Sequence, residues 1–146
     1  NNQGIASVSL TLGPSQGTNT VTATATGLTG SPVTFTETAV APSLNMVMVS
    51  GNNQTGATGA TLPNPLRVAV TDQNANPVSG VPVTFTATQG AGNFGGQPSI
   101  LVNTNGAGLA EAIYTLGAAA GTNTVSASSP GVSGSPVIFT ESSARV

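Results

Sequence analysis

The sequence predicts an all-β fold: an antiparallel β-sandwich that is preceded by the C-terminal half of a second sandwich of the same type. Two observations lead to this prediction. Apolar and polar residues alternate with a period of two along most of the chain, as expected of strands that bury one face. Residues 1–42 also reappear without a gap 104 positions later, with 20 identities in 42 positions, which indicates tandem units.

The repeat divides the chain into a partial unit, residues 1–42, and a complete unit, residues 43–146. A unit of roughly 100 residues can bury its own core. The leading segment needs completion, because domains below about 40 residues usually depend on disulfides, metals or partners, and the chain has no Cys. Since the chain does not begin with Met, we expect a matured product or an excised piece of a tandem array.

Seven strands are predicted in the complete unit, at residues 44–50, 66–72, 80–88, 99–104, 108–117, 122–129 and 135–142, with a long loop over 51–63. The alternation is clearest in the second of these strands, where Leu66, Val68 and Val70 share one face. Seven short strands separated by turn residues are typical of an immunoglobulin-like sandwich.

Turn-forming residues separate the predicted strands. The run Asp72–Pro77 predicts an Asx-rich turn that Asp72 caps with its own side chain. Asn105-Gly106 is the strongest short hairpin signal, and Gly90–Gly96 predicts a flexible loop. Phe94 in that loop is expected to plug one end of the sandwich or to contact a neighbour.

The composition argues against catalysis, because the chain has no His, Cys or Lys to act as a base, thiolate or Schiff-base amine. Glu111 and Glu141 are the conceivable carboxylate pair. However, Glu141 recurs as Glu37 in the partial unit, which favours a structural role, such as accepting backbone hydrogen bonds at a sheet end. We therefore assign no catalytic residue and no cofactor, and the scattered carboxylates predict no metal site.

Charged residues make up only 4% of the chain, against about 25% in average proteins. Two arginines without lysine provide no electrostatic footprint for nucleic acid or an anionic membrane, and no apolar run approaches the ~18 residues of a membrane span. A surface of hydroxyls and amides favours an extracellular location. It also leaves sheet edges without the charges that normally prevent association.

The segments Pro65–Asp72 and Asn76–Phe85 resemble the bacterial immunoglobulin-like repeats of the invasin and intimin type (group 1). Thr104–Ala110 and Gly121–Ala127 add the hairpin and the following strand of that pattern, although the hairpin spacing differs slightly. The resemblance covers residues 43–146 and extends to 1–42 as the C-terminal half of a preceding repeat. It implies an immunoglobulin-like sandwich and a role in rod-like stalks on bacterial surfaces.

The partial unit is expected to form three strands whose apolar face lacks a facing sheet and is therefore a candidate partner interface. Three strands with one bare apolar face are only marginally stable in water. Four outcomes remain open: a missing upstream part, strand addition to a neighbouring chain, a strand swap, or disorder. The candidate interface residues are Val8, Leu10, Leu12, Val21, Ala23, Val33 and Phe35.

Together these features predict a non-catalytic structural module that forms a stiff stalk or an extracellular filament. The module would associate end to end, by strand complementation between copies, and its partners would be other copies of itself or adjacent repeats of a longer chain. The alternative is an adhesin module that binds a glycan or a host receptor. Binding hot spots favour Trp, Tyr and Arg, whereas this chain has no Trp and one Tyr, Tyr114.

Overall fold

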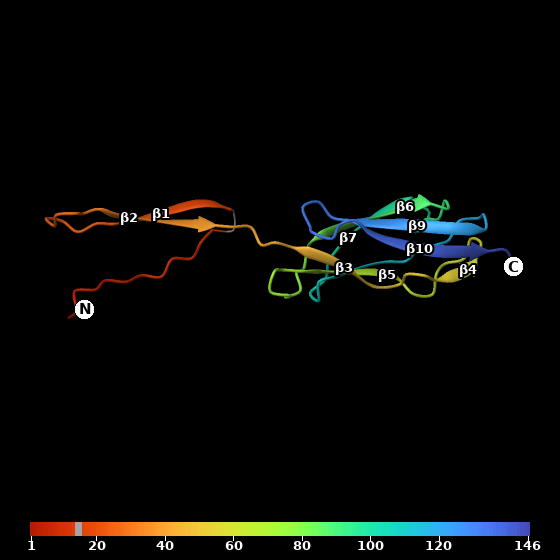
Figure 1. Ribbon diagram of the computed structural model, residues 1–146, viewed down its shortest axis with the longest axis horizontal. Coiled ribbons are helices and arrows are strands. Elements are labelled where there is room, and N and C mark those ends of the chain that lie inside the picture. The colour runs from red at the N-terminus through yellow and green to blue at the C-terminus, as the bar shows by residue number, and fades with distance from the viewer. Residues whose placement is uncertain (14–15) are drawn as a thin grey trace. The chain divides into compact units, whose positions relative to one another are not determined.

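The computed structural model describes residues 1–13 and 16–146, which divide into two compact units. Unit 1 is Asn1–Pro42 and unit 2 is Ser43–Val146 (Figure 1). Every regular element of the described residues is a strand, which confirms the predicted all-β class.

Unit 1 contains one two-stranded antiparallel sheet, formed by β1 (Gly17–Ala23) and β2 (Val33–Ala39). The predicted third strand through Val8 and Leu12 is wrong, because residues 5–13 have no strand assignment. Among the described residues, the backbone of 6–13 makes no hydrogen bond to β1 or β2. A segment becomes a strand only when another strand pairs with it, and the alternating sequence cannot supply that partner.

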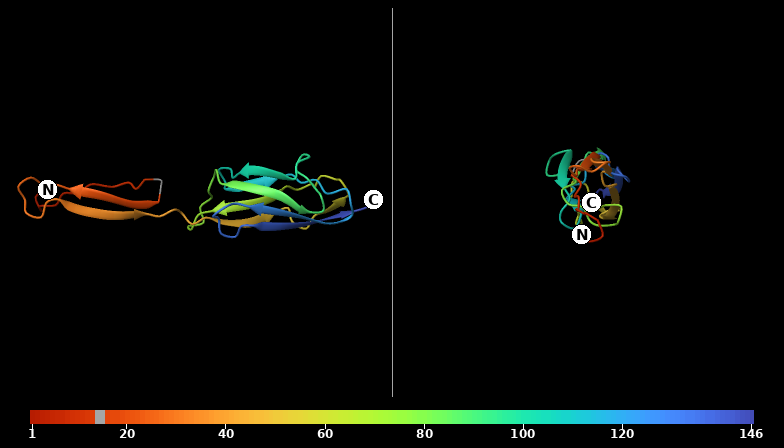
Figure 2. Two further views of the ribbon diagram at one scale, coloured as in Figure 1. Left: turned by 90° about the horizontal axis from the view of Figure 1, so that it is seen from above. Right: turned by 90° about the vertical axis from the view of Figure 1, so that its left-hand side faces the viewer.

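Unit 2 is a sandwich of a five-stranded and a three-stranded sheet, in the orders β4-β10-β9-β6-β7 and β3-β5-β8. The two layers are visible in Figure 1, and Figure 2 shows their strands running along the same long direction. The strands are β3 (Asn45–Ser50), β4 (Thr55–Ala57), β5 (Leu66–Thr71), β6 (Pro82–Gln89), β7 (Ser99–Asn103), β8 (Leu109–Ala112), β9 (Gly121–Ser128) and β10 (Val137–Ala144).

The core of unit 2 lies between these two sheets and follows the predicted alternation. Leu66, Val68 and Val70 of β5 are fully buried, whereas the residues between them are partly exposed. The facing sheet contributes Val83, Phe85, Val125, Ala127 and Phe139, all fully buried. Burial of one face per strand therefore closes the sandwich, as the sequence predicted.

Aromatic rings fill one end of this core. Phe94 packs against Tyr114 with ring centroids 5.1 Å apart and against Phe85 at 6.3 Å. The prediction that Phe94 plugs the sandwich is thus confirmed. Gly92 lies against the hydroxyl of Tyr114, where a Cβ atom would collide with it.

Gly90–Gly96 is not the open, flexible loop that the sequence predicted. Gly92 and Phe94 are buried, and Asn93 exchanges two backbone hydrogen bonds of 2.9 Å with Thr115. The glycines allow the backbone to approach the neighbouring strand closely, which a glycine count alone does not reveal.

Asn105-Gly106 does not form the predicted hairpin, because β7 and β8 belong to different sheets. The Asn105 carboxamide accepts backbone hydrogen bonds from Ala107 at 2.9 Å and from Leu109 at 3.1 Å. This Asx turn carries the chain from one sheet to the other.

Two further predictions fail in detail. The predicted loop 51–63 contains β4, which pairs in parallel with β10 and gives unit 2 eight strands instead of seven. The predicted strand 108–117 is shorter, ending as β8 at Ala112. Both differences depend on long-range pairing, which local alternation does not specify.

The turn after β5 forms as predicted. The Asp72 carboxylate accepts hydrogen bonds from the backbone N–H groups of Asn74 (2.8 Å) and Asn76 (2.9 Å) and from the Asn76 side chain (3.0 Å). These bonds, led by that of the Asn76 side chain, lower the pKa of Asp72.

Candidate partner interface

The β1–β2 pair of unit 1 has the same register as the β9–β10 pair of unit 2. Gly17 pairs with Ala39 and Ala23 with Val33, while the corresponding positions in unit 2 pair Gly121 with Ser143 and Ala127 with Val137. The similar sequences therefore fold locally in the same way.

The turns between these strands also match. The Ser31 hydroxyl accepts a hydrogen bond of 2.8 Å from the backbone of Ala25, and the Ser135 hydroxyl accepts one of 2.9 Å from the backbone of Ser129. Such bonds within six residues need no partner from the rest of the fold. Both hairpins are thus set by their own sequence.

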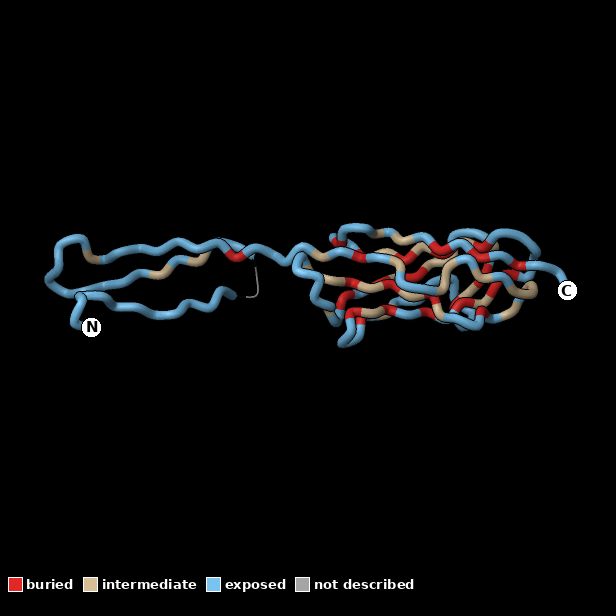
Figure 3. Tube along the Cα trace, turned by 60° about the horizontal axis from the view of Figure 1, so that its bottom comes forward, coloured by how far each residue is buried: buried red, intermediate tan, exposed pale blue. Residues whose placement is uncertain are grey.

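Burial is where the two units differ. Phe35 is 52% exposed and Leu10 is 49% exposed, whereas their counterparts Phe139 and Tyr114 are fully buried. Val8 is 87% exposed. Figure 3 shows unit 1 almost entirely in the colour of exposed residues, while buried residues run through every strand layer of unit 2. The same face is therefore a core in one unit and a surface in the other.

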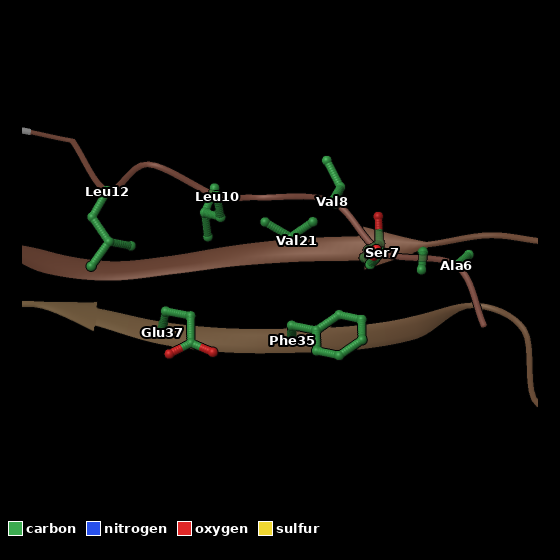
Figure 4. Close-up of a pocket in the computed structure, with 10 residues that line it drawn as sticks. Ala6, Ser7, Val8, Leu10, Leu12, Val21, Phe35 and Glu37 are labelled. Atoms are coloured by element: carbon green, nitrogen blue, oxygen red, sulfur yellow. The ribbon is translucent and has the colours of Figure 1, made fainter. Parts of the chain in front are cut away.

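The exposed face of unit 1 borders a groove of about 730 Å³. In Figure 4, Val8, Leu10 and Leu12 lie on the segment that runs along the two strands, and Phe35 and Glu37 project from β2. The lining residues are Ala6, Ser7, Val8, Leu10, Leu12, Val21, Thr22, Ala23, Phe35 and Glu37.

Six of the seven candidate interface residues line this groove, and the seventh, Val33, is exposed outside it. The structure thus brings the predicted residues together, and their contact with a partner stays a prediction. Sequence reasoning missed Ala6, Ser7, Thr22 and Glu37 as lining residues. The repeat carried a signal for two of them, since Ala6 and Glu37 are identical to their counterparts Ala110 and Glu141.

In unit 2, β6 extends the sheet at the edge of β9, and β5 pairs with β8 in the sheet that covers the equivalent face. Phe85 of β6 pairs with Ala127 of β9, and Leu66 of β5 pairs with Ala112 of β8. The positions equivalent to β9 and β8 in unit 1 have no such partner among the described residues. The missing cover thus corresponds to residues 43–104.

Glu141 lies buried at the end of the unit 2 sandwich and accepts a hydrogen bond from the backbone of Gln54. This confirms its predicted structural role. Burial raises the pKa of Glu141, and the Gln54 hydrogen bond partly opposes that increase. Its counterpart Glu37 is exposed at the groove.

The conceivable carboxylate pair does not form one site. Glu111 is on β8 of the three-stranded sheet, where its carboxylate pairs with Arg67 at 2.9 Å. Glu141 is on β10 of the other sheet and is buried.

No group of three or more His, Cys, Asp or Glu residues gathers within the described part of the chain. That part also contains no helix with the length and apolar character needed to cross a membrane. Tyr114 is fully buried, so it offers no platform for a ligand at the surface.

Three comparisons relate this chain to known proteins. The family model described as bacterial Ig-like domain (group 1) matches residues 45–142. The solved structure of the D00-D0 domain of intimin is similar over 77% of this chain and 56% of its own, with 20% identity and a TM-score of 0.47. This chain thus spans little more than half of that structure, and no curated protein matches it significantly.

The family match confirms the resemblance and the immunoglobulin-like fold that it implied, since it covers most of unit 2. The chain belongs to the group 1 bacterial Ig-like domain family.

Proposed function

We propose that this chain is a non-catalytic structural module of a bacterial secreted or cell-surface repeat protein. Neighbouring repeats associate end to end by strand complementation at unit 1 and so build a stiff stalk or an extracellular filament. The carrying observation is the contrast between Phe35, half exposed in unit 1, and Phe139, fully buried in unit 2.

The apolar character of the groove in unit 1 supports a role in assembly. Each fully buried large apolar side chain stabilises a fold by about 1.5–3 kcal/mol relative to its exposed state. Val8, Leu10, Leu12 and Phe35 stand together on an apolar groove that offers this gain to a partner. Only Glu37 among the lining residues is charged, so little electrostatic repulsion opposes docking.

Deletion of residues 1–42 tests this function. Unit 2 has its own core, so residues 43–146 should remain folded, with Tyr114 still shielded, while self-association is lost. The test compares the full chain with residues 43–146 by size-exclusion chromatography with light scattering and by electron microscopy. Self-association that persists in residues 43–146 would contradict the proposal.

Salt provides a second test of the same association. Because so few charges exist to screen, association of the full chain should change less than twofold between low and high ionic strength. A steep loss of association with added salt would show that charges hold the contact together.

The adhesin alternative gains no support from the described residues. Its best aromatic candidate, Tyr114, is fully buried in the core of unit 2. Phe35 is the exposed aromatic residue, and the burial of its counterpart Phe139 supports a role for Phe35 in a sandwich interior.

A further inference from the structure

The sequence contains more C-terminal half-repeats than N-terminal half-repeats. Residues 1–42 and 105–146 are two C-terminal halves, whereas residues 43–104 are the one N-terminal half. In unit 2 that half already covers residues 105–146. Residues 43–104 are therefore engaged within unit 2, and the apolar face of unit 1 requires a further N-terminal half.

The turns and the hairpin of unit 1 hold the conformation that their counterparts adopt inside a complete sandwich. The Asn1 carboxamide accepts backbone hydrogen bonds from Gln3 at 3.1 Å and from Ile5 at 2.8 Å. Asn105 makes the same Asx turn with Ala107 and Leu109 in unit 2. Because turns and hairpin are already formed, a docking segment need not order them, which lowers the entropic cost of binding.

The register of unit 2 specifies how such a segment would pair. Phe85 of β6 faces Ala127 of β9, so the equivalent residue of a donor strand faces Ala23 at the free edge of β1. Val21, Ala23 and Phe35 are identical to their unit 2 counterparts, so this layer of the groove accepts the same kind of strand.

Residues 6–13 run along β1 and β2. They differ from their counterparts in unit 2 at one charged position and one aromatic position. Ser7 replaces Glu111, which pairs with Arg67 at 2.9 Å in unit 2, so an arginine at that donor position would lose its ion pair. Leu10 replaces Tyr114, whose ring fills the space beside Phe94. Residues 43–104 therefore fit unit 2 better than they fit unit 1.

We infer that the apolar face of unit 1 binds an N-terminal half-repeat from a neighbouring, non-identical repeat, which pairs through a β6-type strand with the free edge of β1. This donor differs from residues 43–104 where it meets Ser7 and Leu10. The inference rests on the proposed function and names the partner of its interface. The differences give each C-terminal half a preferred cover and so keep the repeats in order.

The test joins a second copy of residues 43–104 directly ahead of Asn1 in the full chain. Hydrogen exchange then reports the amides of β1 and β2 with and without the added segment. We expect at least tenfold stronger protection in the extended chain, because the face becomes a core. Unchanged protection would overturn the inference.

The mismatch is tested by Leu10→Tyr in the extended chain, with Ser9→Tyr as the matched control. Ser9 corresponds to Ile113, which is exposed in unit 2, so its substitution should change protection less than threefold. Leu10→Tyr should restore the packing beside Phe94 and raise protection of β1 and β2 by a further threefold or more. A neutral or weakening effect of Leu10→Tyr would overturn the proposed difference between the donors.

A second copy of unit 1 is the competing occupant. It would protect β1 and β2 in the unextended chain in proportion to protein concentration, and the added segment would leave those dimers intact. That result would overturn the inference yet leave the proposed function standing. The proposed function fails separately, if neither the added segment nor a second copy of the chain protects the amides of β1 and β2.

Discussion

Units 1 and 2 share sequence, turns and strand register but differ in what lies across from their apolar face. The Asn1 and Asn105 turns make the same hydrogen bonds, and the two hairpins pair with the same offsets. Phe35 nevertheless remains half exposed while Phe139 is fully buried. Local sequence thus builds the strands, whereas long-range pairing decides whether they enclose a core.

The two units also give the same asparagine different surroundings. Asn123 is buried and receives a 3.0 Å hydrogen bond from the backbone of Gly117, while its own amide donates to Ser143 at 3.0 Å. Asn19 is identical in sequence but only partly buried, and its amide donates a single 3.4 Å hydrogen bond to the carbonyl of Gly17. Asn123 therefore links buried groups of unit 2, whereas Asn19 remains partly exposed to solvent.

The largest expected difference between the two units follows from truncation of the equivalent phenylalanines, Phe139 and Phe35. Phe139→Ala should destabilise unit 2 by about 3–5 kcal/mol, because it removes a fully buried ring and leaves a cavity. Denaturant unfolding followed by the fluorescence of Tyr114 measures it, since this is the single Tyr in a chain without Trp. The matched variant Phe35→Ala should change amide exchange in β1 and β2 by less than threefold; equal losses in both units would break the comparison.

The next largest effect on stability is expected at the equivalent asparagines, Asn123 and Asn19. Asn123→Ala should cost unit 2 about 1–3 kcal/mol, because buried partners of its side chain lose their hydrogen bonds. Asn19→Ala should stay within about 0.5 kcal/mol, as expected of a partly exposed side chain with one long hydrogen bond. Thermal unfolding by circular dichroism compares the two variants, and a larger loss for Asn19→Ala would show that unit 1 already has a core.

Gly92→Ala sharpens the account of the aromatic end of unit 2. Its Cβ would collide with the Tyr114 hydroxyl, so we expect a loss of about 1–2 kcal/mol from forced repacking. Gly106→Ala is the control, since a Cβ there meets no atom within 4 Å. If both variants unfold at the same denaturant concentration, Tyr114 does not hold the position described.

The smallest expected effect is a pH dependence at Glu141. Its pKa is raised in the folded state, so folding takes up a proton between the ordinary and the raised value. The wild type therefore gains stability as pH falls through the raised pKa, and Glu141→Gln lacks this gain.

Unfolding midpoints measured from neutral to mildly acidic pH test this sign. The stability of Glu141→Gln relative to the wild type should decline as pH falls. A Glu141→Gln curve that stays parallel to the wild type throughout would rule out a buried carboxylate.

The sequence by itself determined the all-β class, the period-two core of β5 and the Asp72 turn. Each depends on residues close in the chain: Leu66, Val68 and Val70 share a face through the pleat, and the Asp72 carboxylate reaches backbone N–H groups within four residues. The repeat also identified the apolar face of unit 1, because alternation marks which side of a strand is apolar whether or not a partner covers it.

The tertiary structure decided the rest. It placed β7 and β8 in different sheets despite the Asn105-Gly106 signal, paired β4 with β10 and left residues 5–13 without a strand partner. It also brought Gly92 against Tyr114. All four outcomes depend on which distant segments meet, because backbone hydrogen bonds and side-chain contacts between strands form only after the chain has chosen its pairings.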